Sequence, residues 1–176
     1  TNESVNKALR AEAEGDLANA RLFGDKAIES DLKAQGLRRD TASAWQAAGQ
    51  PERERAAWQR AAKMAAVRAR MLADRIPPLQ KQWEQARDSQ HASLHEAAVM
   101  YLQALIYTAE QWALVVQFSE VGADADQMAV GKAALDKVLL PMQQNGLLDR
   151  LANEPQLAGS IEKIHQWQQM ALPTAR

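Results

Sequence analysis

The longest apolar stretch of the chain extends from Leu94 to Phe118 and contains neither Pro nor Gly. Four of its polar residues recur every seven positions, so on a helix they form one narrow stripe: Glu96, Gln103, Glu110 and Gln117. The remaining surface is largely apolar, whereas a surface helix shows an apolar stripe about 100° wide. The pattern predicts a central helix with neighbours on two or three sides.

This central helix is predicted to cover about residues 79 to 121, after Ile76-Pro77-Pro78 has ended the preceding helix. Gly122 closes it. It forms either one helix or two helices with a joint near Asp88 and Ser89. Four of its apolar residues are expected to be buried in contact with at least two other helices: Leu102, Leu105, Ile106 and Val116.

Two further helical segments precede the central helix. The first runs from Glu3 to Gln35, is broken at Gly15-Asp16 and is stopped by Gly36. The second runs from Leu37 to Asp74 and is broken at Gly49-Gln50-Pro51. Because a long helix needs long partners, we expect both segments to be bent rods that flank it in an antiparallel bundle.

The two breaks lie 34 residues apart, and the residues around them resemble tetratricopeptide repeats over residues 1–70. The matching positions are the turn glycines Gly15 and Gly49, the small residues Ala20, Ala27, Ala42 and Ala61, and the aromatic residues Trp45 and Trp58. The resemblance implies antiparallel helical hairpins, in which small residues let two helix backbones approach. Two Ala-rich helices broken by chance at this interval are the alternative.

After Gly122, a cap at Asp124 or Asp126 predicts a helix that ends near Asn145-Gly146 and is kinked or frayed by Pro141. A last helix is expected from a cap at Asn153-Glu154-Pro155 to about Met170. Nothing alternates with period two, and about a fifth of the residues are Ala. The sequence therefore predicts one all-α domain over residues 1–176.

The net charge of −1 is unevenly distributed along the chain. Residues 36 to 87 carry eleven Lys and Arg against five Asp and Glu, or +6, and the flanks carry the remaining −7. A basic segment can attract nucleic acid or an acidic protein. Since the basic residues are not interleaved with aromatic ones, we expect no nucleic acid partner.

The helix after Gly49 has a basic outer face that includes Arg53, Arg60, Lys63 and Arg70. Its opposite, apolar face is predicted to be Ala57, Ala61, Met64, Val67, Met71 and Leu72. Trp is favoured at binding hot spots, so Trp45 and Trp58 join the four cations as candidate partner-binding residues. Core packing of the Trp residues and a solvated basic face are the alternatives.

Catalytic and metal sites have little support. His91 and His95 lie one helical turn apart, the spacing at which two imidazoles can share a metal, but no third ligand converges with them. Glu96 and Glu110 are separated by roughly 21 Å of helix, too far to act as an acid and base pair. Nucleophile elbows and phosphate loops are absent from the sequence. We expect no cofactor, no metal and no enzymatic activity.

These features favour a non-enzymatic adaptor that holds another protein in a groove between its N-terminal hairpins and its central helix. The partner is expected to be acidic or to present an apolar helix or peptide, and a toxin-neutralising immunity protein is one subclass. A bundle that binds a small ligand or metal in its interior is the alternative. A groove that is open at the surface favours the adaptor, and a cavity enclosed in the core favours the ligand-binding or metal-binding bundle.

The expected location is the bacterial envelope. The chain has no Cys and begins at Thr rather than Met, which would fit a periplasmic protein or lipoprotein whose signal or lipid-bearing Cys has been removed. Gln103, Glu110 and Gln111 interrupt the longest apolar stretch, so no transmembrane span is expected. The cytoplasm is the alternative location.

Overall fold

The computed structural model describes residues 2–13, 17–89, 92–144, 146–151 and 158–171. Within these ranges the chain forms helices and no strand, which confirms the all-α prediction. The helices are α1 (Asn2–Ala13), α2 (Leu17–Ala47), α3 (Pro51–Ala73), α4 (Ile76–Asp88), α5 (Leu94–Val121), α6 (Ala125–Gln144), α7 (Leu147–Leu151) and α8 (Ala158–Ala171).

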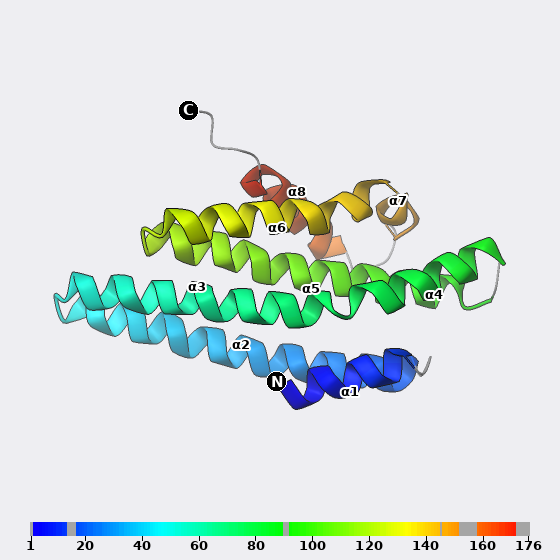
Figure 1. The fold of residues 1–176 in the computed structure, drawn as a ribbon, viewed down its shortest axis with the longest axis horizontal. Helices are drawn as coiled ribbons and strands as arrows, with labels where there is room; N and C mark the ends of the chain where they lie inside the picture. Colours follow the sequence, from blue (N-terminus) through cyan, green and yellow to red (C-terminus); the bar gives the residue numbers. More distant parts are fainter. Residues whose placement is uncertain (1, 14–16, 90–91, 145, 152–157, 172–176) are drawn as a thin grey trace.

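α5 occupies the centre of the bundle. α3 and α4 lie end to end along one side of it and α6 lies along another, while α8 packs against both α5 and α6 (Figure 1). Eighteen of the 28 residues of α5 are buried, including Leu102, Leu105, Ile106 and Val116. The prediction of a central helix with several neighbours is therefore confirmed for residues 94–121.

Of the two possibilities for residues 79 to 121, one helix or two with a joint near Asp88 and Ser89, the structure has two, α4 and α5. α4 ends at Asp88, and the backbone N–H of Ser89, its C-cap residue, donates to the carbonyl oxygen of Gln85 at 3.1 Å. After this end α5 folds back along α4, and the rings of Trp83 and Tyr101 stack with centroids 5.5 Å apart. Burial of these two large rings offsets the loss of helical continuity.

The N-terminal rods also differ from the prediction. α2 continues through Gly36 to Ala47, so the boundary between a 3–35 segment and a 37–74 segment is wrong. A glycine inside a helix costs only about 1 kcal/mol, which the packing of α2 on α1 and α3 outweighs. The predicted turn at Gly49 is present, and this residue adopts the left-handed φ of 66°.

The likeness to tetratricopeptide repeats stays a prediction. Ala42 and Ala61 are buried, as small packing positions require. Gly15 and the side chains of Ala20 and Ala27 lie outside the described residues. Because α2 is continuous, it joins the second helix of one implied hairpin to the first helix of the next.

The buried face of α3 agrees only in part with the predicted one, since Ala61 and Leu72 are buried as predicted but Met64 and Val67 are not. Its buried residues are mostly alanines: Ala61, Ala62, Ala65, Ala66, Ala69 and Leu72. Met64 and Val67, predicted to face inward, are 43% and 46% exposed. α5 supplies large side chains at this interface, so a row of alanines on α3 lets the two helices pack closely.

The C-terminal helices follow the prediction closely. The carboxylate of Asp124 accepts a hydrogen bond from the backbone N–H of Gln127 at 3.1 Å, which confirms Asp124 as the cap of α6. α6 contains Pro141 in its last turn and ends at Gln144. The predicted cap of the last helix, residues 153–155, lies outside the described residues. No helix in the described ranges is long and apolar enough to cross a membrane.

Candidate functional site

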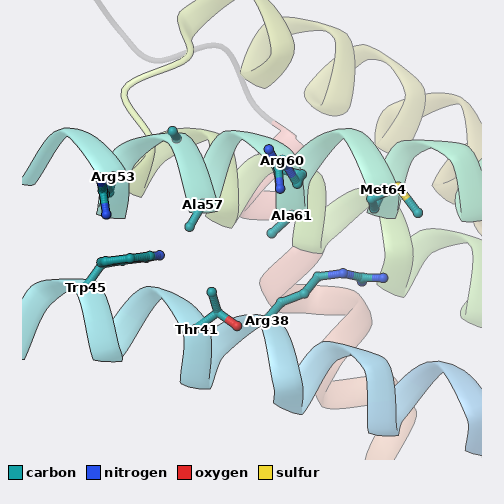
Figure 2. A pocket seen from close by; sticks show the side chains of 9 residues that line it. Arg38, Thr41, Trp45, Arg53, Ala57, Arg60, Ala61 and Met64 are labelled. Carbon is teal, nitrogen blue, oxygen red and sulfur yellow. The ribbon is translucent and has the colours of Figure 1, made fainter.

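A groove with a volume of about 580 Å³ opens between α2 and α3 (Figure 2). We call it the α2–α3 groove. Nine residues line it: Arg38, Thr41 and Trp45 from α2, and Arg53, Ala56, Ala57, Arg60, Ala61 and Met64 from α3. Five of the nine are exposed, so the groove is open to solvent.

Helical spacing explains how these residues share one groove. Arg38, Thr41 and Trp45 are three and four residues apart, which places them on one face of α2. Arg53 and Arg60 are seven residues apart, or two turns, on the matching face of α3. The turn at Gly49 brings the two faces together.

The groove combines an apolar surface with three cations. The guanidinium carbon of Arg53 lies 4.8 Å from the centre of the Trp45 ring, within the range of a cation–π interaction. Arg38 extends from α2 along the groove toward Met64, and Arg60 lines the groove from α3 (Figure 2). None of the nine lining residues is acidic. The electrostatic potential in the groove is therefore positive and favours an anionic ligand.

The structure brings three of the six predicted partner-binding residues into this groove: Trp45, Arg53 and Arg60. Trp58 instead packs against Phe118 of α5, with ring centroids 5.3 Å apart. It is therefore part of the contact between α3 and α5.

Lys63 and Arg70 are exposed on α3 but do not line the groove. The groove also differs in position from the expected one, because it lies between α2 and α3 and has no lining residue from the central helix α5.

Arg38, Thr41 and Met64 were missed by the sequence prediction. The sequence pattern places Met64 on the predicted apolar face and includes Arg38 only in the basic segment. The signal for Arg38 and Thr41 is their distance of seven and four residues from Trp45, which places all three on one face of a helix.

The other candidate sites are weaker. His95 is exposed and His91 lies outside the described residues. No group of three or more His, Cys, Asp or Glu side chains that could hold a metal ion is found in the described part of the chain. The carboxylate of Glu110 lies 3.5 Å from the ammonium group of Lys163, so Glu110 forms an ion pair between α5 and α8.

Comparison of the chain with models of protein families, with curated proteins and with solved structures gave no significant match. The fold and the groove define the molecule as an all-α helical bundle with an arginine-lined surface groove.

Proposed function

We propose that this chain is a non-enzymatic protein-binding domain whose α2–α3 groove holds an acidic segment of a partner protein. The observation that carries the proposal is the convergence of three arginines and Trp45 on one open groove that has an apolar surface and no acidic lining residue. Arginine and tryptophan dominate binding hot spots, and arginine pairs well with carboxylates.

The open position of the groove supports this proposal over a ligand site in the bundle interior. The described core of α5 is filled by large side chains such as Trp112, Leu105 and Tyr101, each at most 6% exposed. The toxin-neutralising subclass and the location in the bacterial envelope remain parts of the proposal.

The proposal is tested by affinity capture from an extract of the native host. The bait is the full chain in three forms: the wild type, Arg53→Glu/Arg60→Glu, and Lys81→Glu/Lys137→Glu. Lys81 and Lys137 are exposed on α4 and α6 and do not line the groove, so the last variant matches the change in net charge. Mass spectrometry identifies the captured proteins, and thermal unfolding verifies that each bait is folded.

We expect a protein that is enriched by the wild type and by the control variant. The Arg53→Glu/Arg60→Glu variant should capture it at least about tenfold less, because two attractive charge pairs become repulsive. Equal capture by all three baits would show that the groove does not bind the partner. Capture of no protein would also contradict the proposal.

A further inference from the structure

The α2–α3 groove is long and straight because helices form both of its walls. Arg53 and Met64 mark its two ends on α3 and are eleven residues apart, which corresponds to about 16 Å of helix. On α2, Arg38 and Trp45 are seven residues apart, or about 10 Å. The turn at Gly49 makes the walls antiparallel. A straight groove of this length matches about three turns of an α-helix.

Small side chains give the groove its depth. Ala56, Ala57 and Ala61 lie along α3, with Thr41 opposite on α2. α3 has alanines on its other side too, where Ala65 and Ala69 are buried at the interface with α5. The groove therefore resembles the surface that α3 presents to α5. A ligand that fills it must bring the large apolar side chains itself, as α5 does.

Exposed apolar side chains continue this surface beyond the groove. Met64 is 43% exposed at one end, and Val67 follows it on α3 with 46% exposure. On α2, Leu37 is 69% exposed and lies one turn before Thr41. Large apolar side chains that flank a cleft indicate a surface that a partner covers.

The arginines determine the charge of that partner. Arg53 and Arg60 are two turns apart on the same wall, about 10 Å along the helix axis. Two carboxylates seven residues apart on a helical ligand have the same spacing. Arginine binds carboxylates through paired, charge-assisted hydrogen bonds, so an acidic ligand can pair with Arg53 and Arg60 directly.

Single-stranded nucleic acid fits the groove less well. Bases bind such proteins by stacking on exposed aromatic rings. The aromatic ring in the groove, Trp45, is half-buried and has the guanidinium group of Arg53 over it.

We propose that the occupant of the α2–α3 groove is an acidic amphipathic α-helix of about three turns, a proposal that rests on the protein-binding function above. Its large apolar side chains pack on Ala57 and Met64. Its Asp or Glu side chains pair with Arg53 and Arg60 on the α3 wall. This is the helix-in-groove mode of recognition, with anchors at positions i, i+3 or i+4, and i+7.

The test is a selection from a displayed library of random 16-residue peptides against the full chain, with binders measured by fluorescence anisotropy and circular dichroism. We expect the enriched peptides to be acidic, with Leu, Phe or Met at helical spacing, and to gain helical ellipticity when bound. Affinity should fall at least about tenfold for Arg53→Glu/Arg60→Glu and stay unchanged for Lys81→Glu/Lys137→Glu. A peptide in which one flanking Glu is changed to Lys should recover binding to the single variant Arg60→Glu.

Three outcomes overturn the inference: enrichment of neutral or basic peptides, binding without gain of helix, or tighter binding of a 16-nucleotide poly-uridine with the same arginine dependence. The last outcome would assign the groove to nucleic acid.

The two proposals can fail separately. If the host protein is captured through Arg53 and Arg60 while the selection yields no acidic helix, only the helical occupant is wrong. If capture is insensitive to both arginines, the groove is not the binding site and both proposals fail.

Discussion

Tyr101 on α5 is fully buried, stacked on Trp83, and its hydroxyl has no hydrogen-bond partner among the described residues. Burial, and secondarily the negative charge of Glu84, raises the pKa of Tyr101 above its usual value. The folded state therefore keeps the phenol neutral where the unfolded state already ionises. This contribution to stability is complete below the unfolded pKa, near pH 10, and is lost as the pH rises further.

We predict that Tyr101→Phe reduces the alkaline loss of stability. The free energy of unfolding, measured in urea at about pH 9 and about pH 11, should fall less in this variant than in the wild type. At neutral pH the change should be within about 1 kcal/mol, because no hydrogen bond to the hydroxyl is removed. Tyr107→Phe, at a half-buried tyrosine of the same helix, is the control. An alkaline loss as large in Tyr101→Phe as in the wild type would contradict the prediction.

At the scale of elements, Gly131 shows how closely α6 approaches α5. A Cβ atom at this position would lie 2.9 Å from Cγ1 of Val115, a fully buried residue whose branched side chain has little freedom to move. At Gly36 in α2, a Cβ atom would meet nothing within 4 Å. The same substitution should therefore have opposite effects at these two helical positions.

We predict that Gly131→Ala destabilises the protein by about 1 to 3 kcal/mol, since the overpacked interface must open. Gly36→Ala should stabilise it by about 0.5 to 1 kcal/mol through the higher helix propensity of alanine. Urea unfolding at neutral pH measures both changes. A gain in stability for Gly131→Ala would show that α5 and α6 are further apart than described.

The helices α5 and α2 show which elements could be predicted from the sequence and which could not. The pattern of apolar residues was sufficient for α5, because nearly its whole circumference is buried and the signal repeats over 28 residues. Gly36 wrongly predicts a helix end, because the local cost of a glycine is small compared with the tertiary contacts of α2. The sequence indicates the position of the turn after Asp88. It does not determine whether the helix breaks there, because no Pro or Gly marks the turn.

For the candidate site, residue type selects Trp45, Arg53 and Arg60, which line the groove. It equally selects Trp58, Lys63 and Arg70, which do not line it. Local sequence was not sufficient for Met64, because periodicity alone does not fix which side of an alanine-rich helix is buried. A face of α3 that contains Ala62 and Ala65 can be buried in a core as readily as the face that contains Met64 and Val67. The large side chains of α5 decide between the two faces, and these lie more than 25 residues further along the chain.

At the scale of the whole molecule, the net charge of −1 opposes nonspecific binding of nucleic acid despite the basic face of α3. We predict that duplex DNA and RNA bind no more tightly than roughly 10⁻⁴ M at physiological salt, the weak end of the nonspecific range. Fluorescence anisotropy with labelled oligonucleotides measures the affinity. An electrophoretic shift at low-micromolar protein that disappears in Arg53→Glu/Arg60→Glu would contradict this and favour a nucleic-acid-binding function.

The burial of α5 on several sides also matters during biosynthesis. α2, α3 and α4 precede α5 in the chain, so they can cover one side of it as soon as it leaves the ribosome. The sides that α6 and α8 cover stay bare until the chain has been extended from Val121 to Ala171. At about 5 to 20 residues per second, these roughly fifty residues take about 3 to 10 seconds to synthesise. During that interval the nascent chain presents its most apolar helix to chaperones and to other unfinished chains.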